Sequence, residues 1–193
     1  MMIEPSVERV ALSNLAYRVT TWREGKGFYT PTSISVHQSA KPLSHADAML
    51  GKLALVHSEL AEAWDAARRH DLDGPDGVVK EIADTAIRLL DIAGACEVDL
   101  EVWLTRLDEV DDPGPQPGST LSEYLLTLHS WVAECSEAVR HEKPEHFALG
   151  LARLYAGLVE VADAFGRTLQ TEIDKKMAVN EKRPVRHGKK TLL

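Results

Sequence analysis

The chain has 193 residues, 44% of them hydrophobic, and a net charge of -8 at neutral pH. This length allows one sizeable core, so we expect a single domain over residues 1–193. Cys96 and Cys135 have no Cys or His at metal-ligand spacing nearby, which argues against a disulfide scaffold or a cysteine zinc site. No apolar run approaches the ~20 residues that span a bilayer, and the N-terminus lacks a signal-peptide pattern. We therefore expect a cytoplasmic protein with no membrane partner.

The periodicity of apolar residues predicts an all-α fold, a helical bundle with no substantial sheet. Residues 25–43 read as a long connection, and 71–77 and 111–119 read as a turn and a linker rich in Asp, Gly and Pro. Thr120 with Glu123 makes a capping box that begins a helix. The predicted helices cover 6 to about 22, 44 to about 70, 78 to 94, 100 to about 110, and most of 120 to 177.

Two acidic pairs, Glu59-x-x-Glu62 and Glu81-x-x-Asp84, lie in consecutive predicted helices. Residues three apart share one face of a helix, so two adjacent helices can bring four carboxylates to one place. Like charges at that distance repel unless a cation lies between them, and a hard divalent ion with oxygen ligands fits this role. The sequence therefore predicts a metal site, with Mg²⁺ as the first choice and Mn²⁺ as the second.

Both pairs can also be ordinary solvent-exposed acids without a metal, because E-x-x-E and E-x-x-D are common on solvated helix faces. The first pair has small and apolar neighbours and no Lys or Arg placed to neutralise it within the helix. The second pair has Lys80 and Arg88 four residues on either side of Asp84, as in an ordinary surface ion-pair ladder.

An internal repeat crosses the predicted linker. Half of the twelve positions are identical between residues 57–68 and residues 129–140, at an offset of 72, and residues 89–93 resemble residues 158–162 at an offset of 69. We interpret the bundle as a duplicated helical hairpin, with a first repeat over 44–110 and a second, degenerate repeat over 120–177.

The second repeat has lost most of the acids under this alignment. The positions of Glu59, Glu62, Glu81 and Asp84 are taken by Trp131, Glu134, Gly150 and Arg153. A competing alignment makes Glu160-x-x-Asp163 the acidic pair of the second half and would give a second site.

The end of the chain, residues 178–193, reads as a basic tail. Between 175 and 190 there are seven Lys and Arg residues and one acid, so the rest of the chain carries -14. A body this acidic disfavours nucleic acid as a partner. The tail is either a solvated extension or a segment that folds back onto the anionic part of a ligand.

Three segments, 52–62, 81–94 and 176–184, resemble the MazG-like all-α nucleoside triphosphate pyrophosphohydrolases, a family that includes dimeric dUTPases and phosphoribosyl-ATP pyrophosphatase. The family signature is E-x-x-E, then E-x-x-D on the next helix, then a K-M-x-x-N-type tail. Here the tail reads Lys176-Met-Ala-Val-Asn180. The resemblance covers about half of the chain, and Lys26-Gly-Phe-Tyr29 also resembles a family feature. The second repeat intervenes before the tail, so the other half of a pseudo-dimer or another subunit would complete the site.

The resemblance implies Mg²⁺-dependent cleavage of a nucleoside triphosphate between its α and β phosphates. Glu59, Glu62, Glu81 and Asp84 would hold the metal, and Glu59 or Glu62 would accept the proton of the attacking water. The other implied roles are phosphate binding by Lys176, Asn180 and Arg183, and weak base stacking by Trp22, Phe28 and Tyr29.

Other functions stay open on the residues themselves. A decayed nucleotide-binding or scaffold protein would explain the lost acids of the second half, and a general phosphohydrolase would release orthophosphate instead of pyrophosphate. A fused chain of two halves is expected to act as a pseudo-dimeric monomer or as a homodimer.

Overall fold

The computed structural model describes residues 5–26, 45–74, 76–107, 114–115 and 118–182, and these residues form helices and their connections with no strand. The prediction of an all-α bundle is confirmed. The helices are α1 (Pro5–Gly25), α2 (His45–Arg68), α3 (Val78–Ala95), α4 (Leu100–Leu104), α5 (Leu121–Arg140), α6 (Pro144–Ala164) and α7 (Leu169–Glu181).

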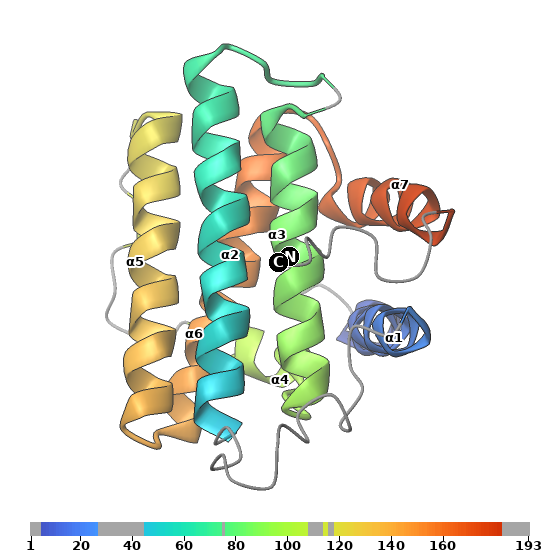
Figure 1. Cartoon of the computed structure of the whole chain (residues 1–193), viewed down its shortest axis with the longest axis vertical. Coiled ribbons are helices and arrows are strands. Elements are labelled where there is room, and N and C mark those ends of the chain that lie inside the picture. Colours follow the sequence, from blue (N-terminus) through green and yellow to red (C-terminus); the bar gives the residue numbers. More distant parts are fainter. Residues whose placement is uncertain (1–4, 27–44, 75, 108–113, 116–117, 183–193) are drawn as a thin grey trace, which may run out of the picture.

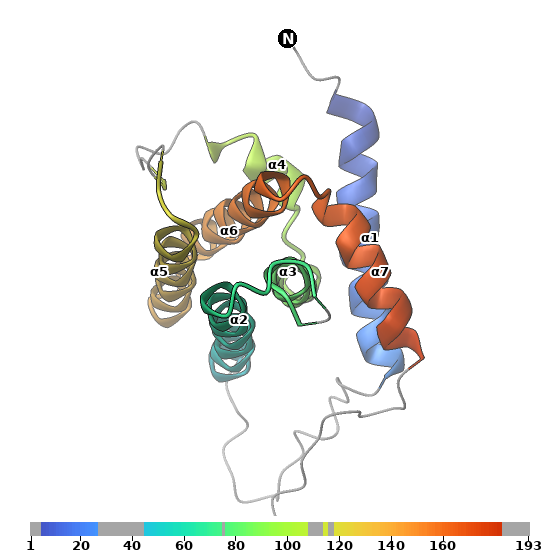
Figure 2. The same cartoon turned by 90° about the horizontal axis from the view of Figure 1, so that it is seen from above.

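Two antiparallel hairpins, α2–α3 and α5–α6, form the body of the molecule, and α2 lies between α3 and α5 (Figure 1). The short helix α4 packs against α6. Helices α1 and α7 both pack against the outer side of α3 and cross it at a steep angle (Figures 1 and 2). Each hairpin contains the helices that the proposed repeat predicts, although duplication itself stays a prediction.

Helix α3 is the centre of the bundle because α1, α2, α6 and α7 all pack against it. Most of its residues are buried, as a helix with neighbours on most sides requires, and its polar side chains gather toward one face. Ile82, Leu89 and Leu90 are completely buried. Each large apolar side chain that is buried in this way stabilises the fold by about 1.5–3 kcal/mol.

A buried charge network fixes α1 to the hairpin that contains α3. Asp91 is inaccessible to solvent, and its Oδ2 accepts hydrogen bonds from Arg23 of α1 and Lys52 of α2. Burial lowers the pKa of both cations, and the charge of Asp91 opposes that shift. Removing one partner from such a pair leaves an uncompensated buried charge, which costs about 3–5 kcal/mol.

Two helix ends differ from the sequence prediction. Helix α4 ends at Leu104 instead of continuing to about residue 110, and the Thr105 hydroxyl donates to the Val102 carbonyl, a local bond that competes with helical pairing. Helix α7 continues to Glu181, four residues into the predicted basic tail, and buries Met177. The predicted capping box is present, with Thr120 and Glu123 bonded reciprocally.

None of the helices in the described part of the chain is both long and apolar enough to cross a bilayer.

The close contact of α5 with α6 depends on glycine. A Cβ added at Gly157 would lie 2.6 Å from Leu128 Cδ2 and 2.9 Å from Trp131 Cζ3, and both of these side chains are buried. We expect Gly157→Ala to lower the free energy of unfolding by about 1 kcal/mol, because overpacking costs ~1–3 kcal/mol and exceeds the gain in helix propensity.

The matched control for this prediction is Gly51→Ala on α2, where the added Cβ meets nothing within 4 Å. This variant should be more stable than the wild type by up to about 1 kcal/mol. Urea denaturation measures both changes, and stabilisation by both alanines would contradict the packing of α5 on α6.

Candidate metal centre

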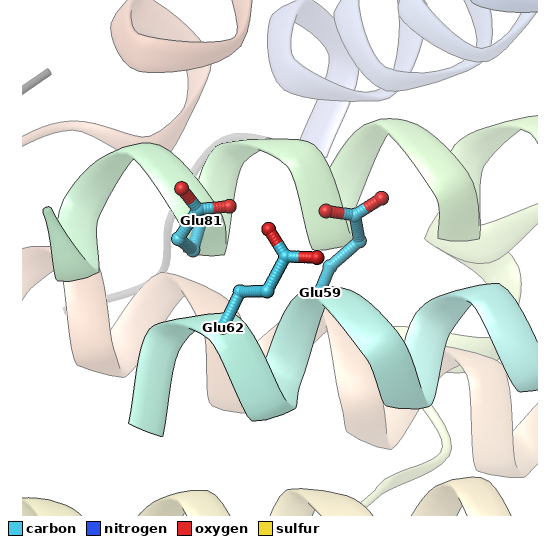
Figure 3. Close-up of side chains that lie close together, drawn as sticks. All are labelled: Glu59, Glu62 and Glu81. Atoms are coloured by element: carbon cyan, nitrogen blue, oxygen red, sulfur yellow. The ribbon is translucent and has the colours of Figure 1, made fainter. Parts of the chain in front are cut away.

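Three carboxylates meet where α2 packs against α3. Glu59 and Glu62 project from α2 toward Glu81 of α3, with Glu62 between the other two in the close-up view (Figure 3). Each residue offers one carboxylate oxygen, and the three oxygens all lie within 4.8 Å of one another. The structure therefore brings together three of the four acids that the sequence singled out.

The fourth acid, Asp84, lies one turn after Glu81 on α3 but is not part of this three-carboxylate group. Its Oδ2 lies 2.5 Å from Nζ of Lys176, and both side chains are mostly buried. Asp84 is thus held by a cation of the protein, at the edge of the group.

The acids of the cluster differ in exposure. Glu81 is buried, Glu59 is nearly so, and Glu62 is exposed. The cluster is therefore open to solutes on the side of Glu62 and closed on the side of α3.

Burial raises the pKa of Glu81 to about 7, and the charges of Asp84, Glu62 and Glu59 add to this rise while Lys176 opposes it. Burial also raises the pKa of Glu59, against the effect of Arg88. Desolvation is the larger cause for both groups, and the neighbouring carboxylates add to it.

Helix α7 places Lys176 beside Asp84 within the same chain. Glu172, which is 1% exposed, fixes the helix in place. Its two carboxylate oxygens each lie 2.6 Å from a lysine nitrogen, one of Lys80 on α3 and one of Lys175 on α7.

The other predicted ligand-binding residues have separate positions. Asn180 is buried on α7, and its Oδ1 has no hydrogen-bond partner among the residues that the structure describes. Trp22 is half-buried on α1, packed against the core. Phe28, Tyr29 and Arg183 lie outside the described residues.

The sequence analysis missed two residues at the site. The sequence predicts only an ion pair between Arg88 and Asp84 on the same helix. In the structure the Arg88 side chain contacts Glu59 on α2, with Nε at 3.0 Å and Nη2 at 2.9 Å from Oε1. The i+4 spacing from Asp84 placed Arg88 on the correct face of the helix. Glu172 had no such signal, because nothing in its neighbourhood in the sequence indicates burial.

The second hairpin does not reproduce the cluster. Arg153 lies 3.0 Å from Glu134 and stacks over Trp131, and together with Gly150 and His57 it lines a cavity of about 730 Å³. Glu160 accepts a hydrogen bond from the Tyr124 hydroxyl. Within the described ranges, neither Glu134 nor Glu160 joins a group of three potential metal ligands, and nor does Asp163.

The donor set of the first hairpin suits a hard divalent cation. All three candidate ligands supply carboxylate oxygens, which such ions prefer. When all of them are deprotonated, these three acids and Asp84 carry four negative charges, and two of these are paired with Arg88 and Lys176. One divalent cation would compensate the remaining two charges, although the geometry does not single out one ion.

Comparison with protein-family models, with curated proteins and with solved structures found no match to this chain.

The raised pKa of Glu81 predicts how stability depends on pH in the absence of metal. Its folded-state value of about 7 exceeds the ordinary 4.5. The stability that the protonated form contributes is present below about pH 4.5 and is lost as the pH rises through about 7. In a chelating buffer we expect this loss to reach at most about 3 kcal/mol and to be absent in Glu81→Gln.

Urea denaturation of both proteins at pH 5 and pH 8 in a chelating buffer measures the difference. Adding Mg²⁺ at pH 8 should stabilise the wild type more than the variant, because the ion compensates the deprotonated carboxylate. An identical pH dependence in the two proteins would contradict the predicted titration of Glu81.

Proposed function

We propose that this protein is a Mg²⁺-dependent nucleoside triphosphate pyrophosphohydrolase that cleaves a (deoxy)nucleoside triphosphate between its α and β phosphates. The observation that carries the proposal is the cluster of Glu59, Glu62 and Glu81 at the contact of two helices. Lys176 of α7 lies next to it and contacts Asp84, one helical turn after Glu81. Three of the four acids that the resemblance implies are grouped here, and Lys176, one of the implied phosphate-binding residues, lies beside the fourth.

Glu59, Glu62 and Glu81 would hold the divalent ion, with Asp84 as a further ligand if Lys176 turns to the substrate. When bound, the ion compensates phosphate charge and lowers the pKa of a water molecule. Arg88 already occupies Oε1 of Glu59, whereas Glu62 is exposed. Glu62 is therefore the better placed of the two candidate bases to take the proton of the attacking water.

The reaction forms a bond between the oxygen of water and phosphorus and breaks the bridging bond between the α and β phosphates. The products are a nucleoside monophosphate and pyrophosphate. Lys176 would neutralise negative charge that builds up on the phosphate oxygens. Asn180 lies one turn after Lys176 on α7, and its amide N–H groups would donate to a phosphate oxygen, since its Oδ1 is itself an acceptor.

A second candidate is a nucleotide-binding protein that has lost turnover. The pairing of Arg88 with Glu59 and of Lys176 with Asp84 favours it, because half of the acidic charge is already compensated within the chain. A screen of the common nucleoside triphosphates with separate detection of pyrophosphate and orthophosphate decides between the candidates, since a binding protein would release neither.

Replacing Glu62 by Gln keeps the size of the side chain and removes its charge. We expect the rate of pyrophosphate release to fall by a factor of roughly 10²–10⁴, the range that a general base contributes, while the helical content is unchanged. Glu134→Gln on α5 is the matched control, because the alignment pairs Glu134 with Glu62 but the structure pairs it with Arg153.

The control variant should keep wild-type kinetics, since Glu134 is 58% exposed and does not belong to the three-carboxylate group. Hydrolysis by Glu62→Gln at the wild-type rate would exclude Glu62 as the base.

The contribution of α7 is tested with Lys176→Met, which removes the charge but keeps an apolar stem beside Asp84. We expect KM to rise by about tenfold or more, because a hydrogen bond to a charged group contributes about 1.5–3 kcal/mol. Lys182→Met, on the last described residue of the basic tail, is the comparison. Equal effects of the two variants would mean that the tail acts through its overall charge and not through the contact of Lys176 with Asp84.

A further inference from the structure

Arg88 is the cation that contacts the carboxylate cluster from within the hairpin itself. It follows Asp84 by one turn on α3, and two of its nitrogens, Nε and Nη2, contact Oε1 of Glu59. Its side chain remains 32% exposed. Arg88 is therefore accessible to a solute that approaches the cluster.

The contact with Glu59 uses only part of the binding capacity of both groups. A guanidinium has five N–H donors, and two of them face Glu59. Both contacts fall on the same oxygen, Oε1, so Arg88 does not use the second oxygen of Glu59. The carboxylate can thus bind a metal ion while Arg88 stays beside it, and the remaining N–H groups can bind a second anion.

The two cations of the site flank the cluster at different acids. Arg88 contacts Glu59, and Lys176 contacts Asp84. A phosphate group on an ion at Glu59, Glu62 and Glu81 would have Arg88 within reach on the α3 side. The planar guanidinium suits this role because its fork matches two phosphate oxygens, whereas an ammonium acts as a point charge.

We propose that Arg88 is a phosphate-binding residue of this site, and that its contact with Glu59 holds it in place before the ligand arrives. This inference rests on the proposed function, which supplies the phosphate ligand. It adds a phosphate contact on α3 to those expected from α7, and it assigns Arg88 a function beyond linking two helices.

A purely structural link between helices is the alternative, and the second hairpin offers a matched control for it. Arg153 of α6 bridges to Glu134 of α5 at 3.0 Å, just as Arg88 of α3 bridges to Glu59 of α2. Arg153→Gln removes an ion pair of the same kind without touching the carboxylate cluster.

The test compares the wild type, Arg88→Gln, Arg88→Lys and Arg153→Gln as full-length proteins by titration calorimetry. The first titration uses Mn²⁺ without phosphate, and the second uses inorganic pyrophosphate at saturating Mg²⁺. We expect Arg88→Gln to bind pyrophosphate about 10- to 100-fold more weakly, as expected for a lost charge-assisted hydrogen bond, while its affinity for Mn²⁺ is unchanged or higher.

Arg153→Gln should match the wild type in both titrations, and Arg88→Lys should fall between the wild type and Arg88→Gln. If Arg88→Gln does not fold, Arg88→Lys replaces it in the test, because lysine keeps the positive charge and loses only the paired N–H donors of the guanidinium. The inference would be overturned if Arg88→Gln bound pyrophosphate with wild-type affinity. If Arg88→Gln does not fold, wild-type affinity of Arg88→Lys would overturn it. A parallel loss of Mn²⁺ affinity would also overturn it, because Arg88 would then act by positioning Glu59.

The binding titrations separate this inference from the proposed function. A wild type that binds pyrophosphate with Mg²⁺ but hydrolyses no nucleoside triphosphate would refute the enzyme while the effect of Arg88→Gln still supports the phosphate contact. Normal pyrophosphate release together with unchanged binding by Arg88→Gln would refute the phosphate contact and leave the enzyme in place.

Discussion

The mutual repulsion of Glu59, Glu62 and Glu81 is the constraint to which the rest of the structure responds. Three carboxylate oxygens within 4.8 Å of one another, one of them on a buried residue, oppose the packing of α2 on α3. Apolar burial on the other faces of the same helices outweighs this cost, since completely buried residues such as Leu60 and Ile82 each contribute about 1.5–3 kcal/mol. The fold thus maintains a local excess of negative charge that a cation can relieve.

The cations of the protein compensate only part of that charge, and each comes from a different place in the fold. Arg88 belongs to the hairpin itself, whereas Lys176 arrives on α7, which Glu172 and its two lysines attach to α3. Asp91, farther along α3, is by contrast paired with two buried cations. The central helix therefore carries Asp91, which is paired and stabilises the fold, and also Glu81, whose carboxylate faces two further acids of α2 and is suited to ligand chemistry.

The two hairpins differ in charge but contact each other at positions that the repeat equates. His57 of α2 and His129 of α5 stack with ring centroids 5.1 Å apart, and their Nδ1 atoms are 2.8 Å apart. One ring must donate and the other accept, so at least one is neutral, in keeping with the lowered pKa that burial gives both. Near this contact, Gly150 and Arg153, which the proposed alignment pairs with Glu81 and Asp84, line the cavity of the second hairpin.

The sequence by itself determined the fold class, most helix boundaries and the meeting of three of the four paired acids. Helical periodicity and the three-residue spacing are local properties, and a short turn between two helices makes them antiparallel neighbours. Glu59, Glu62 and Glu81 could be identified for this reason. The tertiary structure decided what depends on contacts between distant segments: the pairing of Asp84 with Lys176, the burial of Glu172 and the contact of Arg88 with Glu59. These partners are 92, 92 and 29 residues apart along the chain, and no local pattern encodes which of several lysines or arginines reaches a given acid.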